Sequence, residues 1–220
     1  MKHSKWLKLG VLAVATVCVA GAAVPTEETN AGWVRLFDGK TLTGWTPTAK
    51  NQTVKVTDGE IHLLSKKANL WLVHKKSYDH FELEVEAKMP LKGYNSGIGF
   101  RCTPGRKKPK GYQCEIDRKK TGQIYAIGKG WVWPKNKEEK ARFEKMAGDC
   151  FKDGQWNRFR IRCVGKKIQI RVNGVLTADL EDGLFSSGVV ALQHHGKGEV
   201  HRFRNIRIRP LNADGTVAKP

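Results

Sequence analysis

Apolar and polar residues alternate along much of the chain, and a period of two is typical of strands that bury one face. The clearest run is residues 81–89, in which every second side chain from Phe81 to Met89 is apolar. Asn173-Gly174 separates two such runs and predicts a type I′ hairpin, because both residues tolerate positive φ. Related patterns predict strands at residues 60–64, 70–73, 96–102, 112–117, 159–163, 168–172, 175–180, 189–193 and 200–209.

Short strands joined by turns along the whole chain predict an all-β sandwich of two packed antiparallel sheets. One segment has a helical pattern instead. Asn136 can cap a helix over residues 137–146, with Glu139 at the capping-box position and Phe143 and Met146 on one face. The sequence therefore predicts one β-sandwich domain with one short helical excursion.

The N-terminal residues have the features of a secretory signal peptide. Lys2, Lys5 and Lys8 precede the apolar run Leu9–Val24, which includes the small residues Ala20-Gly21-Ala22. Because this run is shorter than the roughly 20 residues that span a bilayer, we expect cleavage and export to the periplasm or the extracellular space, without stable membrane insertion. The predicted division is a signal peptide at residues 1–23, a linker at 24–32, the β-sandwich domain at 33–211 and a polar tail at 212–220.

The chain is strongly basic, with a formal net charge of +19 that falls by three when the signal-peptide lysines are removed. Such a charge favours anionic neighbours, anionic polysaccharides among them. Export argues against nucleic acid as a partner, and so does the spread of Lys and Arg over many strands and loops. A surface that is charged simply for solubility is the alternative explanation.

Four cysteines follow the predicted signal peptide: Cys102, Cys114, Cys150 and Cys163. In an oxidising compartment this even number allows up to two disulfides. We favour a bond between Cys102 and Cys114, because both fall on the apolar side of strands that could be neighbours. Four free, buried thiols are the alternative.

The alternation also sorts candidate site residues by face. In residues 96–102, Gly97, Gly99 and Arg101 share the side opposite the apolar residues. A face with two glycines and one cation leaves room for a ligand. We therefore expect a hollow on this face.

Residues 112–117 sort in the same way, with Gln113, Glu115 and Asp117 on the polar side. Two carboxylates two residues apart on one face suit acid–base chemistry, because their mutual repulsion separates their pKa values. A polar stripe that faces solvent is the alternative, and the nearby Arg101 makes a site the better interpretation.

A third polar cluster, Gln193-His194-His195, closes the predicted strand at 189–193. Histidine titrates near neutrality, binds metals and donates to sugar oxygens. We expect these three residues at the site, whereas His201 is better explained as a packing or surface histidine.

Aromatic residues complete the set of candidates. Trp131 and Trp133 lie in a predicted loop after Tyr125, and exposed aromatic faces can stack on sugar rings. Core packing remains open for either tryptophan. The other tryptophans considered, Trp33, Trp45, Trp71 and Trp156, are predicted to lie in the core.

Several of these stretches together resemble the 3-keto-disaccharide hydrolase family, also described as 3-keto-glucoside 1,2-lyase/hydratase. The similarity extends over nearly all of the predicted mature chain. One departure is that many relatives carry Glu where Gln113 stands and Gln where Glu115 stands. The matching stretches are Leu36–Trp45, Asn95–Arg101, Gly111–Asp117, Thr121–Tyr125, Ala191–Gly196 and Phe203–Ile206.

The resemblance implies a concanavalin A-like jelly roll and a 3-keto-glucoside substrate. It implies that a base removes the C2 proton next to the C3 ketone, that the C1 substituent is eliminated, and that water then adds. On this basis Glu115 or Asp117 acts as base and acid, Arg101 stabilises the oxyanion, and His195 transfers a proton or binds a divalent metal, which stays open as a cofactor. The expected substrate contacts are Gln113, Tyr125, Trp131, Trp133, Gln193 and His194.

Two functions of other kinds remain open. The same sandwich could serve as a non-catalytic carbohydrate-binding module for anionic glycans, since fold alone does not determine function. Cleavage of a sulfated or uronic polysaccharide by β-elimination would also fit the charge. Convergence of acid, base and cation on one face favours the enzyme.

Overall fold

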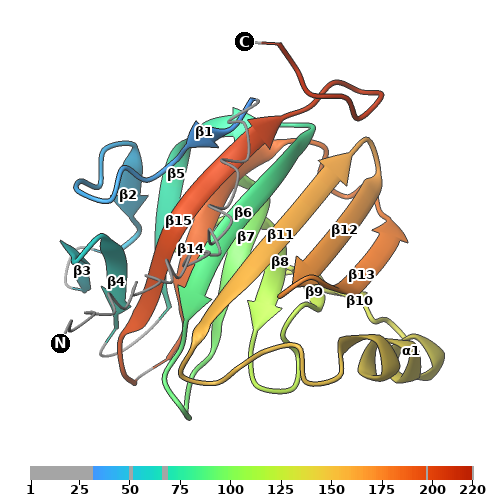
Figure 1. Cartoon of the computed structure of the whole chain (residues 1–220), viewed down its shortest axis with the longest axis horizontal. Helices are drawn as coiled ribbons and strands as arrows, with labels where there is room; N and C mark the ends of the chain where they lie inside the picture. The colour runs from blue at the N-terminus through green and yellow to red at the C-terminus, as the bar shows by residue number, and fades with distance from the viewer. Residues whose placement is uncertain (1–31, 50–51, 66–68, 197, 220) are drawn as a thin grey trace, which may run out of the picture. The chain divides into compact units, whose positions relative to one another are not determined.

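The computed structural model describes residues 32–49, 52–65, 69–196 and 198–219. The predicted signal peptide, and all but the last residue of the predicted linker, lie outside these residues. Within them the chain forms two antiparallel sheets and one helix, so the predicted all-β sandwich with a helical excursion is confirmed (Figure 1).

One sheet, here called the β6 sheet, lies nearer the viewer in Figure 1. Its strand order is β13 (Val175–Glu181), β12 (Lys167–Val172), β11 (Trp156–Val164), β6 (Phe81–Lys88), β15 (His201–Pro210), β4 (Glu60–Leu64) and β3 (Thr53–Thr57), with β1 (Val34–Arg35) paired to β15.

The second sheet, here called the β8 sheet, packs behind it. Its strand order is β10 (Gly130–Trp133), β9 (Ile124–Ala126), β8 (Lys110–Ile116), β7 (Ser96–Thr103), β14 (Gly188–His194), β5 (Leu70–Tyr78) and β2 (Trp45–Pro47).

Alternating burial along the strands produces the core between the sheets. In β6 the apolar side chains of Phe81, Leu83, Val85 and Ala87 are at most 1% exposed. Each large apolar side chain buried in this way contributes about 1.5–3 kcal/mol to folding. The period-two prediction is confirmed here, and it leaves the other face of each sheet for polar side chains.

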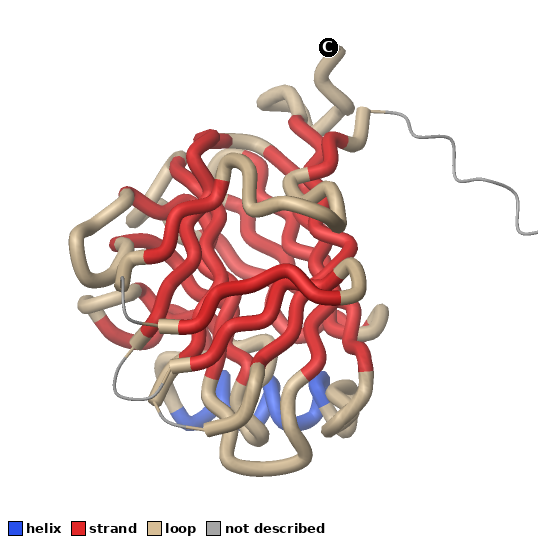
Figure 2. Tube along the Cα trace, turned by 90° about the vertical axis from the view of Figure 1, so that its left-hand side faces the viewer, coloured by secondary structure: helices blue, strands red, loops and turns tan. Residues whose placement is uncertain are grey.

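The helix α1 (Lys137–Ala147) has the predicted N-cap, in which the Asn136 side-chain oxygen accepts from the Glu139 backbone N–H at 2.8 Å. Phe143 and Ala147 are buried, and the helix contacts β13. Figure 2 shows it at one end of the strands. No helix in the described part of the chain is long and apolar enough to cross a membrane.

A β-bulge in β7 reverses the side-chain parity that the sequence predicts. The pairing of β7 with β8 shifts register between Phe100 and Thr103, and Arg101 adopts a positive φ of 48°. Such a bulge redirects the side chains that follow it. Arg101 is therefore 1% exposed, and its guanidinium donates to the carbonyls of Asp79, at 2.6 Å, and Phe185, at 3.3 Å. The prediction that Arg101 shares a face with Gly97 is wrong.

The same bulge explains the cysteines. Cys102 packs in a small cluster with Trp71 on the outer side of the β8 sheet, whereas Cys114 lies in the main core. Both thiols are free, as are those of Cys150 and Cys163, and all four are buried. The predicted Cys102–Cys114 disulfide is wrong, because the bulge places these side chains in different layers.

We predict that Arg101 stabilises the fold rather than acting in catalysis. Arg101→Gln should lower the free energy of unfolding by about 2–4 kcal/mol, because buried carbonyls lose charged donors. Urea denaturation measures this loss. Arg106→Gln, at an exposed position of the β7–β8 loop, is the matched control and should change little. A change at Arg101 no larger than the control would contradict the structural role.

Candidate active site

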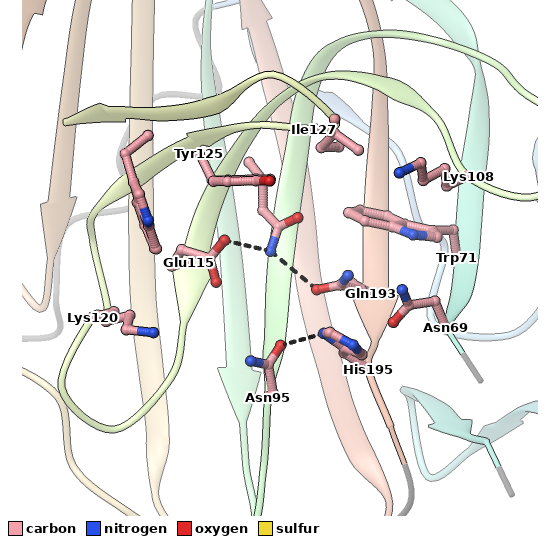
Figure 3. A pocket seen from close by; sticks show the side chains of 13 residues that line it. Asn69, Trp71, Asn95, Lys108, Glu115, Lys120, Tyr125, Ile127, Gln193 and His195 are labelled. Carbon is pink, nitrogen blue, oxygen red and sulfur yellow. Dashed lines mark hydrogen bonds between the residues drawn. The ribbon is translucent and has the colours of Figure 1, made fainter. Parts of the chain in front are cut away.

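A pocket opens on the outer face of the β8 sheet, with a volume of about 300 Å³. This is at the small end of the roughly 300–1,000 Å³ range of ligand pockets. Figure 3 shows Glu115, Lys120 and Tyr125 towards one end and Asn69, Trp71 and Lys108 towards the other. The lining residues are Asn69, Trp71, Asn95, Lys108, Gln113, Glu115, Lys120, Tyr125, Ile127, Gly128, Trp131, Gln193 and His195.

A bridging amide forms the floor of the pocket. The Gln113 side-chain NH2 donates to Glu115 Oε1 at 2.8 Å and to Gln193 Oε1 at 3.0 Å (Figure 3). One NH2 group has two hydrogens, so both are used by these bonds. Gln113 thereby fixes the orientation of the carboxylate and of the second amide.

Gly97 makes this bridge possible. It pairs with Glu115 on β8 and with Gln193 on β14, so it lies between the two acceptors. A Cβ atom at position 97 would lie 2.5 Å from Gln113 Nε2. The predicted free space over this glycine is confirmed, and the Gln113 side chain occupies it.

Glu115 is a buried carboxylate with an unusual titration. It is 7% exposed, and its burial, aided by repulsion from Asp117, raises its pKa to about 7. Attraction to Lys120 and the Gln113 hydrogen bond oppose this rise. A carboxylate with a pKa near neutrality is suited to accept a proton from carbon and to return it.

Asp117 follows the end of β8 and is not part of the pocket lining. Its backbone carbonyl accepts from Lys120 N–H at 2.7 Å, and this turn brings Lys120 back to the pocket. The Asp117 carboxylate is 3.8 Å from Lys120 Nζ. The structure therefore places one of the two predicted carboxylates inside the pocket and the other beside it.

His195 lies at the pocket mouth with a fixed ring. Its Nδ1 is 3.0 Å from Asn95 Oδ1, and its backbone N–H donates to the Asn95 carbonyl. An amide oxygen only accepts, so Nδ1 carries the hydrogen and Nε2 is left for proton exchange. Asn95 was not predicted as a site residue.

His194 points away from the pocket, which corrects the prediction that it contacts substrate. It is 0% exposed and stacks on His201 with ring centroids 4.0 Å apart. Burial lowers the pKa of both imidazoles, to about 3 for His201. Strand alternation explains the difference, because Gln193 and His194 face opposite sides of β14.

The two candidate tryptophans separate. Trp131 is 40% exposed, lines the pocket and meets Tyr125 edge to face at 5.2 Å. Trp133 is 3% exposed and donates its indole N–H to the Thr177 carbonyl at 2.9 Å. Trp133 is therefore a core residue, and the prediction that it binds substrate is wrong.

Trp71 was predicted to lie in the main core, but it lines the pocket instead. Residues 70–73 are buried on both faces of β5, so they show no alternation that could reveal the outward side. Other lining residues that the sequence pattern did not single out come from loops or strand ends, where period two gives no signal: Asn69, Asn95, Lys108, Lys120, Ile127 and Gly128.

The described residues contain no group of three or more His, Cys, Asp or Glu side chains that could hold a metal ion. The pocket lining offers one carboxylate, Glu115, and one imidazole, His195. These donors do not form the full ligand set of a protein metal site. The chemistry considered below uses the chain's own groups.

Comparison with known families now places this geometry. Residues 32–209 match the 3-keto-alpha-glucoside-1,2-lyase-like domain, and the chain belongs to this family. No curated protein matches the chain in sequence.

Solved structures share the fold. A candidate glycosyl hydrolase from Parabacteroides distasonis is 20% identical with a TM-score of 0.62, covering 86% of this chain and 99% of its own. A second such protein from that organism is 24% identical with a TM-score of 0.61, covering 81% and 99%. A Bacillus subtilis protein with a galectin-like fold is 8% identical with a TM-score of 0.57, covering 76% and 89%. The predicted jelly-roll class is confirmed.

We predict opposite pKa shifts of Glu115 in two variants. Gln113→Met removes a donor that stabilises the carboxylate and should raise the pKa, whereas Asp117→Asn removes a like charge and should lower it. Carboxyl ¹³C NMR titration measures both, with Glu138→Gln on α1 as an unshifted control. Shifts in the same direction would show that the pocket electrostatics are wrong.

Proposed function

We propose that the protein is an exported carbohydrate-active enzyme that cleaves 3-keto-glucosides by elimination followed by hydration. Family membership supports a carbohydrate-related function. The observation that carries the finer proposal is Glu115, a carboxylate with a pKa near 7 at the floor of a sugar-sized pocket. Direct glycoside hydrolysis uses two flanking carboxylates, and the pocket lining contains one.

The first step is proton abstraction. A ketone at C3 makes the hydrogen at C2 acidic, and ionised Glu115 takes it as a proton. The electron pair of the C2–H bond forms a C2=C3 double bond, and the ketone oxygen becomes an enediolate oxyanion. Burial of Glu115 favours this step, because a poorly solvated carboxylate with a raised pKa is a stronger base.

Lys120 takes the cationic role that the sequence gave to Arg101. Its ammonium group lines the pocket, 5.4 Å from the centre of the Trp131 ring. A cation near the developing oxyanion lowers the barrier because it stabilises charge absent from the ground state. Arg101, which donates to backbone carbonyls elsewhere, is left out of the mechanism.

His195 completes the elimination as proton donor. When the enediolate collapses, a C1=C2 double bond forms, the C1–O bond breaks, and His195 Nε2 protonates the departing oxygen. Water then adds its oxygen to C1, and Glu115 returns a proton to C2, so the net reaction is hydrolysis. Asn95 supports this role because it fixes the ring orientation.

The remaining pocket residues are proposed to bind the sugar. Trp131 and Tyr125 offer aromatic faces for ring stacking, and Gln193 offers an amide held by Gln113. A binding module would use the same groups without turnover. The carbohydrate-binding module CBM66 from Bacillus subtilis shares the fold at 15% identity with a TM-score of 0.50, covering 74% of this chain and 93% of its own, so turnover decides between the two functions.

We predict that Glu115→Gln lowers kcat on 3-keto-trehalose or 3-keto-sucrose by about 10²–10⁴-fold, the usual contribution of general-base catalysis. For the wild type, kcat/KM should rise with pH through about 7, because the raised pKa leaves Glu115 protonated and inactive below that value. Sugar release measured across pH provides both numbers. Glu144→Gln, on the exposed side of α1, is the control.

Two results would contradict this proposal. One is full activity in Glu115→Gln. The other is wild-type protein that binds the keto-sugars but never releases product, which would favour the binding module.

Export is proposed from residues 1–23 alone. Expression of the full chain in a Gram-negative host should give a periplasmic protein that lacks this segment. Intact mass and N-terminal sequencing of the fractionated protein measure this, and Lys5→Glu/Lys8→Glu should slow processing. Uncleaved protein confined to the cytoplasm would contradict export.

A further inference from the structure

A field of arginines covers the outer face of the β6 sheet, on the opposite side of the sandwich from the pocket. They project from β11, β12 and β15, and in β11 they alternate with core residues such as Ile161. We call this surface the arginine face. It consists of Arg158, Arg160, Arg162, Arg171, Arg202, Arg204, Arg207 and Arg209.

Carboxylates of β6 lie beneath the guanidinium groups and not between them and solvent. The Glu84 side chain is 5% exposed and pairs with Arg158, Arg160 and Arg207, whose side chains are 47%, 38% and 27% exposed. Glu82, at 12%, pairs with the more exposed Arg162 and Arg209, and Glu86 pairs with Arg204. Three acids thus hold six arginines, and positive charge remains in excess at the surface.

Two tryptophans fix the arginines further. The Arg204 guanidinium lies 4.0 Å from the ring centre of Trp156, and those of Arg207 and Arg209 lie 4.5 and 4.9 Å from Trp33. Both tryptophans were predicted to lie in the core, but they are half-buried on this face. Such contacts hold a guanidinium plane in place.

The outer edges of the arginine face carry additional charge. Arg171 is exposed and lies opposite Arg160 in the β11–β12 register, where two like charges meet. Arg202 is 44% exposed, and its nearest printed acid, Glu60, is 3.8 Å away. Adjacent like charges destabilise a sheet, so this arrangement is better explained by an anionic partner than by stability.

We propose that the arginine face binds polysaccharides that carry sulfate or carboxylate groups. Each guanidinium has five N–H donors in a fork that matches such groups, and Arg158 uses one of them on Glu84 in the bonds described above. A field spread over three strands suits anions repeated along a polymer. Family membership and the sugar-sized pocket favour a polysaccharide over DNA or lipid.

This site is independent of the proposed catalysis. Because the arginine face and the pocket open from opposite outer faces of the sandwich, a bound polymer leaves the pocket accessible. The surface would hold the protein on an anionic matrix while the pocket acts on a small sugar.

The test measures binding to dextran sulfate and polygalacturonate at about 0.1 M salt, where the screening length is about 10 Å. The face variant is Arg158→Gln/Arg171→Gln/Arg202→Gln. The matched control, Lys137→Gln/Lys140→Gln/Lys145→Gln, removes the same charge from exposed positions of α1. We expect the face variant to bind at least about tenfold more weakly, since charged hydrogen bonds contribute about 1.5–3 kcal/mol each, and the control to change less than about twofold.

Further arms make every outcome decisive. Arg171→Gln alone keeps all the Glu pairs and should still weaken binding if the triple variant fails to fold. Glu115→Gln should bind the polymers normally, and the face variant should cleave keto-sugars normally, which separates this proposal from the catalytic one. Equal losses in the face variant and the α1 control, tighter binding to duplex DNA or to phosphatidylserine vesicles, or no preference over neutral dextran would each overturn it.

Discussion

The hydrogen bond from Gln113 to Glu115 is the interaction on which the site depends, because it holds a carboxylate in a poorly hydrated place without neutralising it. Glu84 provides the contrast within the same protein. Burial would raise its pKa, but hydrogen bonds from Arg160, Arg207 and Arg158 lower it instead. Glu84 is 3% exposed and Glu115 is 7% exposed, so similar burial leads to opposite titration. The direct partners decide whether a buried carboxylate serves as a structural anion or as a base.

The jelly roll supports both arrangements because its two outer faces are separated by one apolar layer. Core packing consumes every second side chain of strands such as β6, and the alternate positions are free to carry charge. On the β8 sheet, Gly97 leaves room for an amide to cross between strands. On the β6 sheet, large guanidinium groups fill the corresponding space. The departure at Gln113 and Glu115 fits the same geometry, since the two side chains are hydrogen-bonded neighbours and either position places its polar group at the pocket floor.

The sequence pattern predicted the long strands, the two sheets and the capped helix, because each follows from local alternation or a local cap. It predicted Gln113, Glu115 and Gln193 on one face for the same reason. It failed where one residue breaks the period: the bulge at Arg101 reverses parity, and so misplaces both that arginine and Cys102. Short strands β1, β2, β9 and β10, and loop residues such as Lys120, carry no period at all. Their positions depend on contacts distant in the sequence.

The central claim is that Glu115 removes the C2 proton, and hydrogen exchange on a substrate that cannot react further tests it most directly. The 3-keto form of 1,5-anhydroglucitol has no leaving group at C1, so proton abstraction in D2O would appear as deuterium at C2 without cleavage. Proton NMR can follow this position, with the C4 hydrogen, also next to the ketone, as an internal reference. We expect wild-type protein to exchange C2 selectively and Glu115→Gln to exchange it no faster than buffer. Exchange at C2 that is absent in the wild type, or equally fast in the variant, would contradict the account.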